Sequence, residues 1–297
     1  MFSEKKVRVE ITKYTTSVEG GSLLTNFSSG ETYVFDGMKV SCQIQKVPAT
    51  CGYVASIDIY GVSQQELSSI TNIAWIQGKI VPMSVRVYAD DGNGYVTVFE
   101  GGVMEAIPNY KNVPDVSIHI ESSMMVYPNQ KKVPPISFVQ GTIISDICKK
   151  LCSSCGYGCI VSPELNLMYW KGGPKSLTQR SFGECVRELC RIAGLEYAMK
   201  NNSVVFYEEG VGTRTTYTFG PKDYVGYPTF EQFGISIKLD NVTSSINCGD
   251  VFKISGSVVP NADGYWVTNK IEYKLETWKK NGAWDMILHG TRTALNG

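Results

Sequence analysis

The chain has 297 residues, enough for two or three domains, and 43% of them are hydrophobic, enough for a substantial core. Its 28 basic and 28 acidic side chains give a formal net charge of zero, which argues against the clustered positive charge of a nucleic-acid-binding surface. No apolar run reaches the roughly 20 residues of a membrane-spanning helix and the N-terminus lacks the apolar core of a signal peptide, so we expect no stable membrane association.

Residues 1–125 carry the patterns of β-strands. The run from Val7 to Thr12 alternates apolar and polar side chains, as a half-buried strand does. We predict a long strand from Val34 to Ile44 and another from Val54 to Gly61. Glycine and serine at 20–22 and 28–30 indicate a loop region before them.

A short helix and a hairpin complete this region. Ser63 and Glu66 have the spacing of a capping box, and Leu67, Ile70 and Ala74 give one apolar helix face. Asn93-Gly94 lies between two alternating runs, where a tight hairpin needs positive φ at both turn positions. The predicted strands around and after it are 85–89, 95–101, 103–110 and 116–122. We expect a β-barrel with the helix across one opening.

Residues 126–210 read as a small α/β domain. Prolines and lysines from Pro128 to Pro135 indicate a linker at its start. One amphipathic helix is predicted from Thr142 to Cys155 with a stop at Gly156, and a second begins at Ser181 and ends at Gly194. The remaining predictions are a strand pair of 159–161 with 167–170 and a hairpin of 196–199 with 203–207.

Residues 211–297 return to β-structure. Alternating or apolar runs predict strands at 234–239, 251–256, 265–278 and 283–291, with turns at 262–264 and 280–282. Both β regions close with a long strand, a polar turn and a return strand. This shared ending predicts two barrels of the same kind on either side of the middle domain.

Cysteines are the main candidates for chemistry. Cys148, Cys152 and Cys155 have the spacing with which some radical enzymes hold an iron–sulfur cluster. The same three residues fall on one apolar helix stripe, where a reduced cysteine acts as a small hydrophobe, and we favour this structural role. The alternative is an iron–sulfur or zinc site that adds Cys159, Cys185 or Cys190. A cytoplasm would keep all nine cysteines reduced.

Other catalytic patterns are weak. The two histidines, His119 and His289, are expected to face solvent or an interface, because no nucleophile elbow accompanies them. Asp90 and Asp91 are predicted to form a turn rather than a catalytic pair. The glycines at 92 and 94 join two strands and open no helix, so they form no phosphate loop. We therefore predict no catalytic, cofactor-binding or metal-binding residues and no cofactor.

Aromatic residues leave a further alternative. Seventeen tyrosines and five tryptophans on β domains could stack sugars in a carbohydrate-binding tail module. We favour their placement in barrel cores and subunit interfaces, where tyrosine and tryptophan are enriched.

The order of the β segments resembles the baseplate hub, or tail hub, proteins of tailed bacteriophages, especially contractile-tailed ones. The segments that carry this resemblance are 36–41, 57–67, 95–110 and 114–116 in the first β region, and 234–239, 246–254 and 264–273 in the last. The resemblance is one of pattern and order, and it covers nearly the whole chain.

This resemblance implies a fold and a function. It implies two tail-tube-like β-barrel domains that flank the α/β domain, in a homotrimeric, non-enzymatic ring. The six barrels would adapt a hexameric tail tube protein above to a trimeric central spike protein below, with other baseplate proteins around them. DNA would pass only transiently through the lumen of the virion's tail baseplate, which is assembled in the host cytoplasm. Some hubs carry a lytic domain; none follows the second barrel in this sequence, so lysis would belong to another protein.

Overall fold

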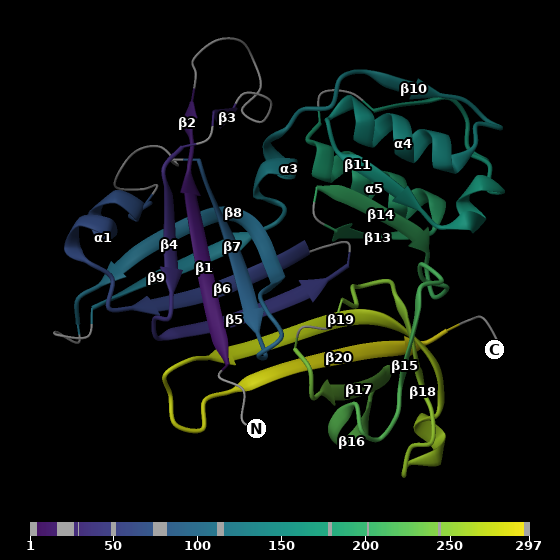
Figure 1. Cartoon of the computed structure of the whole chain (residues 1–297). Coiled ribbons are helices and arrows are strands. Elements are labelled where there is room, and N and C mark those ends of the chain that lie inside the picture. The colour runs from purple at the N-terminus through teal and green to yellow at the C-terminus, as the bar shows by residue number, and fades with distance from the viewer. Residues whose placement is uncertain are drawn as a thin grey trace.

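A long, mostly antiparallel sheet runs through the molecule, and helices and short strands from the middle of the chain pack at one side of it (Figure 1). The computed structural model describes residues 5–16, 27–28, 30–48, 52–73, 82–111, 116–177, 180–200, 202–242 and 245–293. We refer to residues 1–125, 126–210 and 211–297 as the N-terminal, middle and C-terminal segments.

The N-terminal segment is built from strands and one helix. Its elements are β1 (Lys6–Lys13), β2 (Thr15–Thr16), β3 (Phe27–Ser28), β4 (Thr32–Asp36), β5 (Val40–Val47), β6 (Gly52–Tyr60), α1 (Gln64–Ile70), β7 (Met83–Asp90), β8 (Val96–Asn109) and β9 (Ser117–Ser123). In β1 the apolar side chains of Val7, Val9 and Ile11 are buried while their neighbours are partly exposed, which confirms the alternation. The loop predicted around Gly20 falls outside the described residues.

The strand predicted from Val34 to Ile44 is wrong in its extent. Gly37 has a φ of 68°, a conformation that glycine adopts at little cost, and the chain turns there. The turn separates β4, which pairs with β1, from β5, which pairs with β6 and β19. One apolar run therefore supplies two strands at distant places in the sheet.

The predicted hairpin is confirmed, although its turn differs. The positive φ angles belong to Gly92 (100°) and Gly94 (106°), not to Asn93. The Asp90 carboxylate accepts hydrogen bonds from the amides of both glycines, at 2.6 and 2.8 Å, and so fixes a longer loop. The return strand, β8, continues through the predicted break at Gly102 for 14 residues, with a bulge between Val103 and Glu105.

Helix α1 begins with the predicted capping box. The Ser63 hydroxyl accepts a hydrogen bond from the Glu66 amide, and the Glu66 carboxylate accepts one from the Ser63 amide. Leu67 and Ile70 are buried, as the helix period requires. The helix ends at Ile70, and Ala74 lies outside the described residues.

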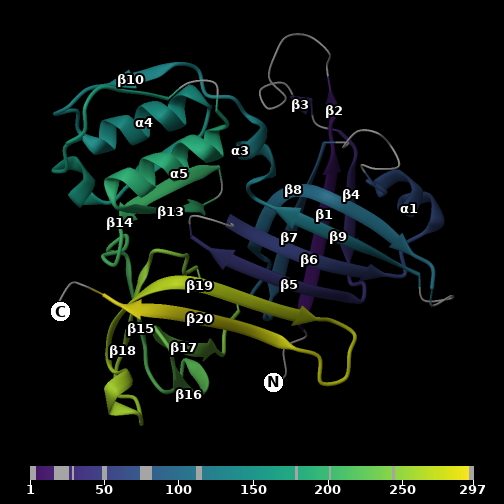
Figure 2. The ribbon, with the colours of Figure 1, turned by 180° about the vertical axis from the view of Figure 1, so that it is seen from behind.

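The middle segment contains helices on one face of a small sheet. Its elements are α3 (Val126–Gln130), β10 (Ile136–Phe138), α4 (Ile144–Ser154), β11 (Gly158–Val161), η1 (Pro163–Asn166), β12 (Lys175–Leu177), α5 (Phe182–Ala193), β13 (Leu195–Lys200) and β14 (Ser203–Glu208). Helices α4 and α5 and the hairpin β13–β14 confirm the predictions (Figure 2). The predicted linker is instead partly helical. Its first residue, Pro128, lies within α3 and is buried.

One predicted strand pair in this segment is wrong. Strand β11 pairs in parallel with β14, and η1, β12, α5 and β13 lie between these two strands in the chain. Tyr169 forms only an isolated bridge with Ile143, and β12 pairs with β10. Local spacing suggested a hairpin, but the hydrogen-bonding partner of β11 is set by the packing of α4 and α5 over the sheet.

In the small sheet β11–β14–β13, strands β13 and β14 are buried on both faces. Tyr197 and Phe206 lie in the core beneath α4 and α5, whereas Ala198, Val205 and Tyr207 belong to the core of the large sheet. Alternate side chains of a strand point to opposite faces, so this sheet joins the two cores.

The C-terminal segment extends the large sheet. Its elements are β15 (Thr216–Phe219), β16 (Tyr224–Glu231), β17 (Gly234–Leu239), β18 (Val251–Ile254), η2 (Pro260–Ala262), β19 (Gly264–Glu276) and β20 (Trp284–Arg292). The strand order β16–β17–β20–β19–β5–β6–β9–β8–β7–β1–β4 is continuous. The mainly β class is thus confirmed, and strands of both β segments belong to one hydrogen-bonded sheet.

Gly194 offers a test of the α5 ending. It has a φ of 67°, and a Cβ added there meets no heavy atom within 4 Å, so the cost of Gly194→Ala is that of the backbone conformation. We expect a loss of about 1 kcal/mol of unfolding free energy in urea. Gly173→Ala is the matched control, because it also has open space but no positive φ. Equal unfolding free energies of the two variants would contradict the left-handed conformation of Gly194 at the end of α5.

Candidate assembly surfaces

The two β segments repeat one strand order. In the N-terminal set the neighbours are β1–β7–β8–β9–β6–β5, and in the C-terminal set they are β15–β18–β19–β20–β17–β16. The last five strands of each set follow one another in the chain in the same sequence, β5 to β9 and β16 to β20. The sets differ in their first strand, because β1 runs antiparallel to β7 whereas β15 runs parallel to β18.

A bulge marks the same place in both sets. In the β8–β9 ladder the register shifts between Val103 and Glu105, and in the β19–β20 ladder it shifts between Thr268 and Lys270. Bulges bend a strand and increase its twist, so both long strands curve at corresponding points. The bulges also allow the residues of the N-terminal strand set to be aligned with those of the C-terminal set. The sequence alone does not provide this alignment.

The two sets meet where β5 pairs with β19. The ladder runs from Ser41 opposite Glu276 to Lys46 opposite Ile271. The Thr277 hydroxyl accepts a hydrogen bond from the Val40 amide and donates one to the Met38 carbonyl, both at 2.8 Å, and so closes the end of the ladder.

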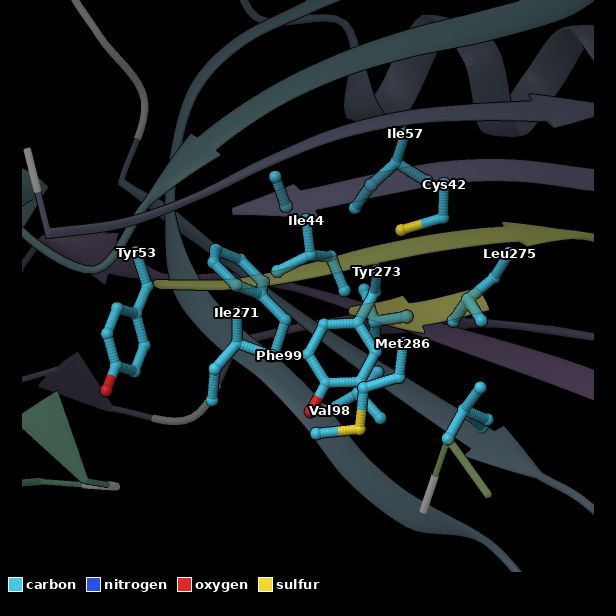
Figure 3. Packing of buried hydrophobic residues seen from close by; sticks show 14 of the residues in the cluster. Cys42, Ile44, Tyr53, Ile57, Val98, Phe99, Ile271, Tyr273, Leu275 and Met286 are labelled. Carbon is cyan, nitrogen blue, oxygen red and sulfur yellow. The ribbon is translucent and has the colours of Figure 1, made fainter. Parts of the chain in front are cut away.

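Apolar side chains pack beneath this ladder. Figure 3 shows side chains from β5, β6, β8, β19 and β20 in a common core, with Ile44 near Tyr273. Ile44, Ile271 and Leu275 are fully buried. Burial of each such side chain contributes roughly 1.5–3 kcal/mol, so the joint is stabilised by packing as well as by backbone hydrogen bonds.

All three segments meet around the buried Lys46. Its ammonium nitrogen lies 5.5 Å from the ring centre of Tyr53 and 5.0 Å from that of Tyr273. Within the described part of the chain, no carboxylate forms an ion pair with it. The Cys248 thiol donates to the Lys46 carbonyl at 3.3 Å, and the backbone of the neighbouring Gly249 closely approaches the Tyr207 ring.

Burial controls the ionisation of this junction. It lowers the pKa of Lys46 to about 8 and raises that of Cys248 to about 12. It also raises the pKa values of the Tyr53 and Tyr207 hydroxyls well above the ordinary value. The tyrosine rings offset part of the cost of the buried ammonium through cation–π contact.

Asp91 has a role that the turn prediction missed. Its carboxylate accepts hydrogen bonds from the Trp284 indole and, at 3.1 Å, from the Val242 amide. It therefore ties the β7–β8 hairpin to the C-terminal segment, some 150 residues away. Asp90 alone behaves as the turn former that the sequence predicts.

Five of the six middle-segment cysteines are buried, and Cys159 is partly exposed. Cys148, Cys152 and Cys155 are buried beside α5, which contributes the buried Cys185 and Cys190. Burial raises the pKa of Cys185 to about 11, which disfavours the thiolate that binds metals. A hydrogen bond from Cys152 lowers the pKa of the half-buried Cys159. Across the described ranges, no group of three or more His, Cys, Asp or Glu side chains could hold a metal ion.

The two histidines lie among carboxylates. His119 is placed between Asp58 and Glu121, with nitrogen–oxygen distances of 2.9 and 3.0 Å. His289 lies 2.9 Å from Glu231. Burial lowers the pKa of His119, but the two carboxylates outweigh it, so that its pKa is raised. Neither histidine has a serine or cysteine nucleophile among its hydrogen-bonding partners in the described residues.

Exposed apolar side chains gather at one end of the sheet. Strand β16 and the turn after it expose Val225 (51%), Tyr227 (68%), Phe230 (50%) and Phe233 (79%). Strand β16 is the last in the sheet order, so one of its edges has no neighbouring strand in the described chain. An open edge with apolar side chains is a typical surface for assembly. No described helix is both long and apolar enough to cross a membrane.

Solved structures with a similar fold include tail proteins and a secretion-system component. The 43 kDa tail protein of prophage MuSo2 from Shewanella oneidensis is 10% identical, with a TM-score of 0.60 and coverage of 97% of both chains. A tail protein from Neisseria meningitidis MC58 is 9% identical, with the same TM-score and coverage. The E. coli c3393 protein, a type VI secretion component, is 7% identical with a TM-score of 0.59, over 86% of this chain and 74% of that one.

These similarities place the chain in the class of proteins with a phage tail fold. A family model described as Baseplate hub gp41 matches residues 22–281. The chain therefore belongs to this family of baseplate hub proteins, which confirms the resemblance found in the order of its β segments. The sequence matches no curated protein.

Replacement of Lys46 tests the cost of its buried charge. The pKa of Lys46 is lower in the folded chain than in the unfolded one, so the unfolded chain binds more protons between about pH 8 and 10.5. Stability should rise with pH across this window. In Lys46→Met we expect stability to rise less with pH than in the parent chain. At pH 7 the unfolding free energy of the variant should exceed that of the parent by on the order of 1–3 kcal/mol.

Urea unfolding at pH 7 and pH 10 measures this effect. Lys222→Met, at an exposed position, is the control and should leave the pH dependence unchanged. A destabilised Lys46→Met chain at pH 7 would mean that the tyrosine rings hold the ammonium favourably despite its burial.

The pKa of His119 should lie above the ordinary histidine value. Because its folded pKa is raised, its contribution to stability is fully present below about pH 6.5 and is lost as pH rises through the folded pKa. Asp58→Asn should lower the His119 pKa, as followed by the ring-proton shifts in NMR. An unchanged pKa would show that Asp58 does not stabilise the imidazolium.

Proposed function

We propose that this chain is the structural hub of a phage tail baseplate and works as a homotrimeric ring. The observation that carries the proposal is the internal repeat, in which two strand sets share one order and one bulge position. Three chains would present six similar strand sets. Such a ring can contact a hexameric tail tube protein on one side and a trimeric central spike protein on the other, because it contains both symmetries.

The division into three domains is part of the proposal, and the separate core of the middle segment supports it. Residues 1–125 and 211–297 would each form part of a tube-like barrel wall whose curvature closes only in the ring. The middle segment has a core of its own beneath α4 and α5, and we propose that residues 126–210 form a separate α/β domain on the outside of the ring. There it would contact other baseplate proteins.

The relatives of the fold support a structural role. One similar structure is a Francisella PdpA–VgrG complex, with a TM-score of 0.55 and 8% identity over 99% of this chain and 59% of that one. The E. coli c3393 protein is described as similar to the phage T4 tail proteins gp27 and gp5. By this analogy the chain would lie next to a spike protein in the virion, with DNA passing through the lumen and no catalysis of its own.

Native mass spectrometry tests the proposal. The chain is measured alone and with the tube and spike candidates encoded beside it. We expect a trimer, or a monomer that becomes a trimer when a partner is added. A monomer that binds neither partner would contradict the hub, and stoichiometric iron, zinc or glycan binding would then favour the metalloprotein or carbohydrate-binding alternative.

A further inference from the structure

The β5–β19 pairing that joins the two strand sets has a counterpart that is unpaired within the chain. The strands equivalent to β5 and β19 are β16 and β8, and they do not pair with each other among the described residues. Within the chain, β5 of the N-terminal set pairs with the second half of β19. In the C-terminal set β16 takes the place of β5, and in the N-terminal set β8 takes the place of β19. Among the described residues, one edge of β16 has no neighbouring strand, and the second half of β8 pairs with β9 on one edge and forms a single bridge, Asn72 with Ala106, on the other.

We propose that β16 of one copy docks against the second half of β8 in the next copy, in the register of the β5–β19 joint. This proposal rests on the hub function and identifies the surfaces that would join its subunits. The occupant of the open edge is a second copy of this chain, because the chain itself already contains the complementary surface.

The two bulges define the register. Aligning them makes Lys270 equivalent to Glu105, and therefore Lys274 equivalent to Asn109. Glu121 lies opposite Glu105 and His289 lies opposite Lys270, so these two partners are also equivalent. On their other side, Glu121 lies opposite Ser56 and His289 opposite Ser236, which makes Ser56 equivalent to Ser236.

The same alignment extends to the docking strands. Gln43 lies opposite Ser56, and Thr229 lies opposite Ser236, so Gln43 and Thr229 are equivalent. Since Lys274 lies opposite Gln43 within the chain, Thr229 of one copy should lie opposite Asn109 of the next.

Phe230 shows that this surface is incomplete in the single chain. By the same alignment it takes the place of Ile44, and both residues lie opposite a buried side chain, Ile235 and Ala55 respectively. Ile44 lies opposite Tyr273 of β19 and is fully buried, whereas Phe230 is 50% exposed. Phe230 therefore lacks the cover that a paired β19-like strand gives Ile44, and Pro108 of the next copy is the residue placed to supply it.

A groove beside β8 can receive this strand. It has a volume of about 510 Å³ and is lined by residues 107–111 and His119. Tyr110 at its end is 44% exposed. Its apolar residues match the exposed aromatic side chains of β16 in chemistry.

Two features limit the backbone pairing to a short ladder. Asn72 already exchanges two backbone hydrogen bonds of 3.0 Å with Ala106, so the incoming strand pairs beyond that residue. Pro108 lacks an amide hydrogen and can only accept a bond there. The prolines in β8 and β16 also keep these edges from pairing indiscriminately, so that side-chain packing decides the partner.

A disulfide tests the register. The Lys274–Gln43 pair lies between hydrogen-bonded pairs, where Cα atoms are about 4.5 Å apart, within the range that a disulfide spans. A chain with both Asn109→Cys and Thr229→Cys, mixed with the tube and spike candidates, is oxidised with diamide, which takes up the two thiol hydrogens. We expect covalent trimers on a non-reducing gel.

Four control proteins accompany the double variant. The unmodified chain and each single variant should give no covalent trimer. The pair Lys111→Cys with Thr229→Cys is shifted by two residues and should cross-link at least about tenfold more slowly, because its Cα atoms lie beyond the reach of a disulfide. Equal rates for the two pairs, or no cross-link in a trimer, would overturn the register.

A charge at Phe230 tests the surface independently. Phe230→Asp should weaken trimer formation by at least about tenfold, because it places a carboxylate in the apolar contact. Leu167→Asp, at an 80% exposed position of the middle segment, is the matched control and should not. Both variants should keep the circular dichroism spectrum and melting temperature of the parent.

The outcomes separate the two proposals. A trimer that forms without the cross-link and tolerates Phe230→Asp leaves the hub function in place and rejects the β16–β8 contact. A chain that stays monomeric with every partner rejects both. Cross-linked trimers together with loss of assembly in Phe230→Asp support the contact.

Discussion

The pairing of β5 with β19 is the interaction on which the arrangement of the large sheet depends. These strands are more than 200 residues apart in the chain, yet they form a continuous ladder over a shared apolar core. The entropic cost of closing such a long loop grows only slowly with its length, whereas each buried aliphatic or aromatic side chain contributes roughly 1.5–3 kcal/mol. The middle segment can therefore be inserted between the two β segments without preventing their contact.

The same joint explains why polar groups are buried nearby. Lys46 is the last β5 residue opposite β19, and it lies where the small sheet of the middle segment meets both β segments. Its ammonium has aromatic neighbours but no carboxylate partner among the described residues, an arrangement that tends to cost stability. A junction of this kind fixes the relative placement of three segments, because Tyr53, Tyr207 and Cys248 reach it from different parts of the chain.

The open β16 edge carries a risk of aggregation that the fold limits. A strand edge with exposed Tyr227, Phe230 and Phe233 would be a hazard in a solitary protein. The bulge near Pro228 and the proline in β8 make both edges poor templates for indiscriminate pairing. These features would limit edge-to-edge aggregation of the single chain.

Local signals in the sequence were enough for many elements. The capping box at Ser63, the start of α5 after Ser181, the stop at Gly194 and the alternation of β1 depend on neighbouring residues, so spacing alone predicts them. Burial of Cys148 likewise follows from the helix period. The order of β segments was also sufficient to indicate the baseplate hub family, because order survives when individual residues change.

Only the tertiary structure decided which distant strands pair. The parallel pairing of β11 with β14, the division of the apolar run at Gly37 and the β5–β19 joint all depend on packing between segments far apart in the chain. The contact of Asp91 with Trp284 has no local signature for the same reason. A sequence records local preference directly, but strand partners are chosen by the burial of whole surfaces, which no short pattern contains.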